Sequence, residues 1–168
     1  MRFEVTGAEE IAAPIAQVWT RLLDHEYVAS CAPNVESVEA ADETHFTVVT
    51  ALGVGSIRLR FTLRVALEDL AAPTFARMRV SGDAPGSAAR AEASATLTET
   101  APGATQLDWV LAADVHGTIA GVGARLLKGT ARKLTARFWK AFADGVVPGA
   151  APPKGKRAKA RTRARKPA

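Results

Sequence analysis

The chain has 168 residues, of which 48% are hydrophobic, and a formal net charge of +5. This length suits one domain with a sizeable core, and the apolar content excludes a globally disordered chain. The single cysteine, Cys31, excludes an intramolecular disulfide and a thiolate metal cluster, and it agrees with a reducing cytoplasm.

The positive charge is concentrated near the C-terminus. Eight basic residues and no acidic one lie between positions 154 and 166: Lys154, Lys156, Arg157, Lys159, Arg161, Arg163, Arg165 and Lys166. The rest of the chain carries 14 basic and 17 acidic residues, so its body is mildly acidic. Residues 149–168 contain no large apolar side chain, which predicts a disordered basic tail after a folded domain over 1–148.

The N-terminal third predicts a strand followed by two short helices. Residues 3–12 alternate weakly between apolar and polar, and Pro14 then suits a helix start, where its missing N–H costs nothing. Asp24 is placed to cap a second helix, which ends before the turn-like segment 31–34. The N-terminal residues lack the apolar stretch of a signal peptide, and no apolar run is long enough for a membrane-spanning helix.

The middle of the chain predicts a meander of antiparallel strands. Between Gly55 and Glu68 the alternation is regular, and one face collects Ile57, Leu59, Phe61, Leu63, Val65 and Leu67. Weaker segments of the same kind follow the ranges 35–40, 44–52, 74–82, 88–99 and 105–116. Short turns rich in glycine and proline separate them, so consecutive strands should be neighbours in one sheet.

From 118 to 147 the apolar period changes to 3.6, which predicts one continuous helix of about 45 Å. Its apolar stripe is Ile119, Val122, Leu126, Leu134, Phe138 and Phe142. Only this helix is long enough to cover the apolar face of the sheet. We therefore predict an α+β helix-grip fold, in which a curved antiparallel sheet of about seven strands wraps around a long C-terminal helix.

Small residues on both sides of this interface indicate a pocket. Inward positions of the strand near 88–99 read Ala89, Ala91, Ala93, Ala95 and Leu97, and the predicted helix carries Gly121, Gly123 and Gly129. Either the sheet packs tightly on a thin helix, or an apolar hollow remains that suits a quinone, a fatty acid or another lipid-like molecule. We favour the hollow. Its predicted ligand-binding residues are Phe46, Phe61, Met78, Ala91, Ala93, Trp109, Leu111, Gly123, Leu126, Leu134 and Phe138.

The sequence offers little for catalysis or metal binding. His45 and His116 fall on strand positions that face solvent, and His25 lies at a helix start, where capping is the simpler role. No spacing typical of a metal site appears, and Cys31 would act as a nucleophile only with a histidine such as His25 beside it. We therefore predict no catalytic residue, no metal and no intrinsic cofactor.

Several segments resemble known families. The pattern Ile15-Ala16-Gln17-Val18-Trp19 followed by Leu22-Leu23-Asp24 resembles the START-like (SRPBCC) superfamily of lipid-binding and cyclase domains. Residues 28–34, 55–65 and 121–138 together resemble the carbon monoxide dehydrogenase G-subunit family, over roughly residues 1–147. That family usually reads Cys-Ile-Pro-Gly where this chain has Cys31-Ala32-Pro33-Asn34, a change that alters one end of the pocket.

The resemblance implies an accessory protein of molybdenum hydroxylases of the carbon monoxide dehydrogenase type, and together with the predicted hollow and the lack of catalytic residues it suggests a non-catalytic protein that binds a lipophilic molecule. Such a protein would help tie its enzyme to the inner face of the cytoplasmic membrane. The basic tail suits an anionic membrane or a protein partner, and without an aromatic residue for stacking it is less suited to nucleic acid. A START-like cyclase or hydrolase, and a ligand-free interaction module whose tail binds nucleic acid, are the alternatives.

Overall fold

The computed structural model describes residues 1–146, and the predicted basic tail over 149–168 lies outside the described residues. The strands, in chain order, are β1 (Arg2–Ile11), β2 (Val35–Ala40), β3 (His45–Val54), β4 (Ile57–Ala71), β5 (Phe75–Ala84), β6 (Ser87–Ala101) and β7 (Ala104–Gly117). The helical segments are α1 (Ile15–Leu22), α2 (His25–Cys31), the short 3-10 helix η1 (Thr118–Val122) and α3 (Ala124–Val146).

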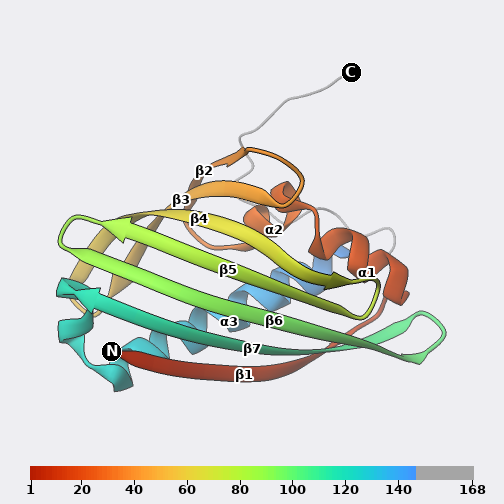
Figure 1. The fold of residues 1–168 in the computed structure, drawn as a ribbon. Helices are drawn as coiled ribbons and strands as arrows, with labels where there is room; N and C mark the ends of the chain where they lie inside the picture. The colour runs from red at the N-terminus through yellow and green to blue at the C-terminus, as the bar shows by residue number, and fades with distance from the viewer. Residues whose placement is uncertain (147–168) are drawn as a thin grey trace.

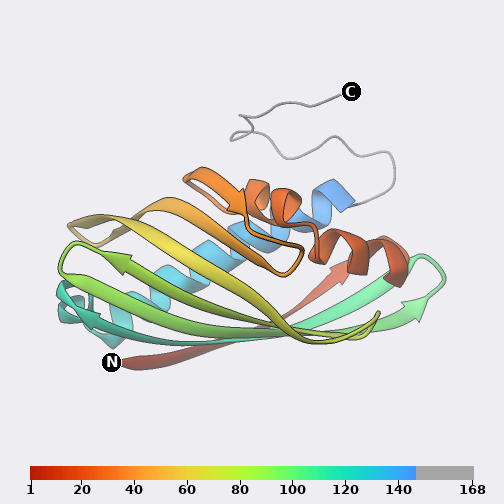
Figure 2. The same cartoon turned by 45° about the horizontal axis from the view of Figure 1, so that its top comes forward.

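The seven strands form one antiparallel sheet in the order β1-β7-β6-β5-β4-β3-β2. Short turns join the hairpins, and Gly55, Gly86 and Gly103 in these turns adopt positive φ angles of 61°, 72° and 78°. In Figures 1 and 2 the sheet curves around α3, which lies along one of its faces. The predicted fold class, a curved sheet gripping a C-terminal helix, is confirmed.

The prediction of one continuous helix from 118 to 147 is wrong. The chain forms η1, passes through Gly123 with a φ of 98°, and only then enters α3, whose 23 residues span about 35 Å. Because the break restarts the helical register at Ala124, the predicted stripe does not continue through it. Leu126 is 43% exposed, and the buried residues of α3 are Leu127, Ala131, Trp139, Phe142 and Val146.

Hydrogen bonds fasten α1 and α2 to the C-terminal end of α3. Gln17 Nε2 donates to the carbonyl of Val146 at 2.9 Å, and the Tyr27 hydroxyl donates to the carbonyl of Phe142 at 2.6 Å. Asp24 caps α2, as predicted, by accepting from the backbone N–H of Tyr27 at 3.1 Å. These bonds close one end of the space between sheet and helix.

Within the described residues, each helix falls short of the length or apolarity needed to cross a bilayer. The longest, α3, carries six Lys and Arg residues along its 23 positions. It is therefore built to pack one apolar side against the sheet and to present a charged side to its surroundings.

The buried core is divided into three clusters. A large aromatic cluster lies under α1, α2 and the C-terminal half of α3, and includes Trp109, Trp139 and Phe142. A second cluster around Phe61 lies at the other end of α3, and a third around Phe46 lies on β3 and β4. Half-buried Phe3 packs against both the first and the second cluster, and Leu63 packs against both the second and the third, so the clusters are linked at their edges.

Candidate functional site

The side of the sheet that faces α3, called the inner face below, carries small residues at its centre. The alanine row predicted on β6 is on this face. Ala91 lies between Val80 of β5 and Ala113 of β7, and Ala93 lies between Met78 and Leu111. Alanine at two successive inward positions leaves the middle of the sheet thin, while α3 contacts mainly the edge strand β1 and the helix α2.

The residues at this centre are not fully covered by the protein. Ala91, Ala93, Met78 and Val80 of the sheet, and Leu134 of α3, are each only half-buried; these five are called the central patch below. Ala91, Ala93 and Leu134 pack against none of the three buried clusters. Part of this exposure is on the opposite side of the sheet, because Val80 and Ala91 also line a depression there. Ala93, Met78 and Leu134 keep accessible surface that the rest of the protein does not cover.

The other predicted ligand-binding residues surround the central patch. Phe46, Phe61 and Trp109 are buried, one in each of the three clusters, so they bound the space and offer little surface to a ligand. Leu111 and Phe138 are half-buried at the edge of the aromatic cluster. The structure thus brings most of the predicted set together around one apolar region.

Gly123 and Leu126 lie apart from that region, at the start of α3. The Leu126 side chain points to the β3–β4 turn, where its Cδ2 lies 3.0 Å from the position that a Cβ on Gly55 would occupy. Leu126 therefore lies beside the β3–β4 turn and away from the central patch.

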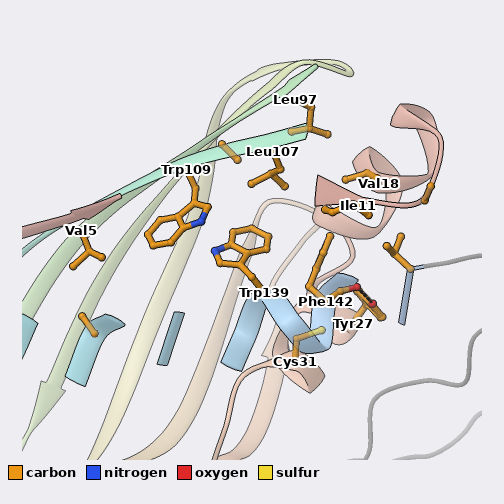
Figure 3. Packing of buried hydrophobic residues seen from close by; sticks show 14 residues of the cluster. Val5, Ile11, Val18, Tyr27, Cys31, Leu97, Leu107, Trp109, Trp139 and Phe142 are labelled. Carbon is orange, nitrogen blue, oxygen red and sulfur yellow. Dashed lines mark hydrogen bonds between the residues drawn. The ribbon is translucent and has the colours of Figure 1, made fainter. Parts of the chain in front are cut away.

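The aromatic cluster closes the end of the space nearest α1 (Figure 3). The indole rings of Trp109 and Trp139 stack with centroids 6.3 Å apart, and Phe138 meets Trp139 edge-on at 4.8 Å. Gly7 permits this arrangement, because a Cβ there would lie 2.5 Å from the ring of Trp109. Glycine is needed on β1 so that the indole can lie flat against the strand.

One polar residue of the inner face escaped prediction. Glu9 of β1 is half-buried, and its Oε2 accepts a hydrogen bond from Nε1 of Trp109 at 3.1 Å. Glu9 is in phase with Phe3, Val5 and Ile11 of the same strand, so the two-residue alternation of β1 already predicts that its side chain faces inward. The carboxylate adds a polar group beside the aromatic cluster, and Thr105 and Ser87 are two further polar residues buried in the domain.

Cys31 is not arranged as a nucleophile. The thiol is buried, and burial raises its pKa to about 11, so it remains protonated at neutral pH. Burial also raises the pKa of Tyr27, whose hydroxyl is committed to the backbone of α3. His25 packs its ring against Phe46, with centroids 5.5 Å apart.

The remaining histidines are at the surface. His45 is exposed and contacts Asp42 at 3.0 Å, and His116 is exposed with Asp114 at 3.4 Å. Hydrogen bonds from the backbone of Thr44 and from His45 lower the pKa of Asp42 to about 2. In the part of the chain that the structure describes, no three His, Cys, Asp or Glu side chains gather as metal ligands.

The opposite, outer face of the sheet has two adjoining depressions of about 510 and 540 Å³. They share Arg64, Ser81, Arg90 and Asp114 in their walls, and Arg64 forms an ion pair with Asp83. These walls combine charged side chains with Val80, Ala88 and Ala91, and they are open to solvent. A water-avoiding molecule bound there would stay partly in water, so the inner face, which is flanked by α3, is the better candidate for a lipophile.

Comparison with known families identifies the relatives of this fold. The sequence profile of CoxG, the G-subunit family of carbon monoxide dehydrogenase, matches residues 7–147, which is most of the chain. The chain belongs to the CoxG family. No curated protein matches it.

Solved structures similar to this CoxG-family chain share its fold. A conserved protein from Geobacillus kaustophilus has a TM-score of 0.80 and 24% identity, over 86% of this chain and 95% of that one. The Zhui aromatase/cyclase from Streptomyces sp. R1128 has a TM-score of 0.67 and 18% identity, over 87% and 94%. A START superfamily protein from Mycobacterium smegmatis has a TM-score of 0.63 and 14% identity, over 86% and 96%. The CoxG-family chain therefore has a START-like fold.

The fold also explains the departure from the family's Cys-Ile-Pro-Gly sequence. Asn34 stands at the glycine position and adopts a φ of 63°, in the left-handed region. Asparagine is among the few residues that enter this region at low cost, so the backbone keeps the turn that a glycine would make.

Proposed function

We propose that this chain is a non-catalytic accessory protein that binds a lipophilic small molecule, a quinone or a lipid-like compound, on the inner face of its sheet. The observation that carries the proposal is the central patch: half-buried apolar side chains at the middle of a sheet, while α3 packs mainly against the edge strand β1 and against α2. Burial of apolar ligand surface there is worth about 25 cal/mol per Å². The CoxG family and the START-like fold support this assignment.

The partner that we propose is a molybdenum hydroxylase of the carbon monoxide dehydrogenase type, in keeping with the name of the family. A redox enzyme that reduces a quinone needs access to a molecule that partitions into the bilayer. A protein that holds the quinone in an apolar interior would link the enzyme to the inner face of the cytoplasmic membrane. The central patch supports this role, because holding a quinone requires apolar surface and no charged or catalytic group.

The basic tail supports the membrane side of the proposal. Eight Lys and Arg residues between 154 and 166 would be attracted to anionic lipid by about 1 kcal/mol each near the surface, less in salt. Replacing all eight by Gln should weaken sedimentation with vesicles of phosphatidylglycerol and phosphatidylcholine. Equal sedimentation of both proteins would remove the tail from the mechanism, and preference for DNA over vesicles in competition would favour the nucleic-acid alternative.

A titration with decylubiquinone tests the ligand site. Trp109 and Trp139 border the space, so a bound quinone should quench their fluorescence in a saturable manner. Leucine at both Ala91 and Ala93 should weaken the binding by filling the patch. The matched control is Ala88→Leu, which adds the same volume on the outer face and should leave the titration unchanged. Unsaturable quenching, as for free tryptophan, would contradict the proposal.

A further inference from the structure

The folded domain has a strongly basic surface of its own, distinct from the tail. No Asp or Glu occurs between Val115 and Ala143, and α3 carries six cations over that stretch. They are Arg125, Lys128, Arg132, Lys133, Arg137 and Lys140, all exposed except the half-buried Lys128. Among these six, only Lys140 forms an ion pair within residues 1–146, with Asp144 at 3.1 Å. Lys133, Arg137 and Lys140 lie opposite the buried stripe of α3, Arg125 and Arg132 lie beside it, and the half-buried Lys128 lies within it.

The outer face of the sheet is different, because its cations are largely compensated. Arg60 pairs with Glu36 at 2.8 Å, and Arg79 pairs with Glu68 at 2.7 Å and with Glu92 at 3.5 Å. The uncompensated positive charge of the domain is therefore concentrated on α3. An anionic partner would be attracted to this side of the molecule and orient the domain with the sheet pointing away.

An exposed apolar side chain lies within the basic surface. Leu126 is 43% exposed and lies in the first turn of α3, against the β3–β4 turn at Gly55. Half-buried Ile57, Leu59 and Val122 occupy the same end of the molecule. Figures 1 and 2 show that this end is opposite the one covered by α1 and α2.

We propose that the exposed side of α3, with Leu126 at its leading end, is the surface by which the folded domain lies on an anionic lipid bilayer. Cations next to an exposed aliphatic side chain suit the boundary between headgroups and acyl chains. A nucleic acid would gain from the cations alone, since the exposed side of α3 carries no aromatic residue for stacking. A lipophile then passes between the bilayer and the central patch beside Leu126. This inference rests on the proposed function and names where that function meets the membrane.

Site-specific labelling of the full-length chain tests the inference. The variant Leu126→Cys is labelled with an NBD fluorophore, whose emission rises several-fold and shifts to the blue in a bilayer. Leu70→Cys and Val110→Cys are matched controls, because these exposed apolar residues are 39% and 38% accessible and lie away from α3. Cys31 is buried, so the surface thiol is labelled selectively. Phosphatidylglycerol vesicles should produce the change at position 126 and not at 70 or 110.

Charge substitutions supply the second readout. Gln at both Lys133 and Arg137 should lower the affinity of full-length protein for these vesicles by about 25-fold, from about fivefold per lost cation. Gln at both Arg2 and Arg90, which removes the same charge from the outer face, should have a clearly smaller effect. An unchanged label at 126 on vesicle-bound protein, insertion at 70 or 110 instead, or a response of the 126 label to duplex DNA would overturn the inference. Decylubiquinone binding can persist in all of these cases, so the two proposals fail separately.

Discussion

Enlarging an alanine of the inner face tests whether space lies at the central patch. Ala91→Leu adds three carbon atoms between Val80 and Ala113, where the structure leaves accessible surface. Each newly buried methylene is worth about 0.8 kcal/mol, so complete burial would give about 2.4 kcal/mol and the half-buried position about 1 to 2 kcal/mol. We therefore expect Ala91→Leu to stabilise the protein once any bound lipophile has been removed.

The same substitution four residues further along β6, at Ala95, should change the free energy of unfolding in the opposite direction. Ala95 lies on the same strand and the same face, but it is 7% exposed and packed within the aromatic cluster beside Trp109. Overpacking of a filled core costs about 1 to 3 kcal/mol, so Ala95→Leu should destabilise. The pair differs only in whether the protein has already filled the space.

Urea unfolding followed by far-ultraviolet circular dichroism measures both variants. With a slope of about 2 kcal/mol per molar urea, Ala91→Leu should raise the midpoint by about 0.5 to 1 M, and Ala95→Leu should lower it by a similar amount. A clear destabilisation by Ala91→Leu, equal to that of Ala95→Leu, would refute the reasoning, because it would mean that the centre of the inner face is packed as tightly as the aromatic cluster.

The remaining predictions concern backbone geometry and titration. Gly7→Ala should destabilise by about 1 to 3 kcal/mol, because its Cβ would strike the Trp109 ring, whereas Gly129→Ala, which meets open space in α3, should stabilise by about 1 kcal/mol in urea unfolding. Asn34→Ala should cost about 1 kcal/mol, while Asn34→Gly leaves the melting temperature unchanged or raises it. Native Cys31 should resist iodoacetamide at pH 8 and react after denaturation. Because the pKa of the folded thiol, about 11, exceeds the unfolded value of 9, the free energy of unfolding should fall as the pH rises above 9. Rapid native alkylation would contradict the expected resistance of Cys31.

Strong local patterns determined how much of the fold was predictable. The alternation from Ile57 to Leu67 and the glycine turns at Gly55 and Gly86 specify strands and hairpins within a few residues, so the meander and its inward faces were readable. The break at Gly123 was not, because an isolated glycine in a periodic segment gives no sign of its φ angle. Counting the stripe through that break placed Leu126 on the wrong side of the helix.

The candidate site was predictable in its composition and not in its depth. Periodicity places Ala91 and Ala93 inward, but only the path of α3, which leans on β1 and α2, decides that they remain uncovered. Glu9 was not predicted because a polar residue in a weakly alternating strand is normally expected to face solvent. Its bond to Trp109 depends on a pairing between strands that are a hundred residues apart in the chain.

Native mass spectrometry of the full-length protein, purified without detergent and sprayed under gentle conditions, tests the central claim most directly. We predict a fraction with an added mass of one lipophilic molecule, which disappears after organic extraction, returns on incubation with decylubiquinone, and is diminished when Ala91 and Ala93 are both replaced by Leu. A protein that shows only the mass of its own chain, before and after incubation with decylubiquinone or a fatty acid, would contradict the claim.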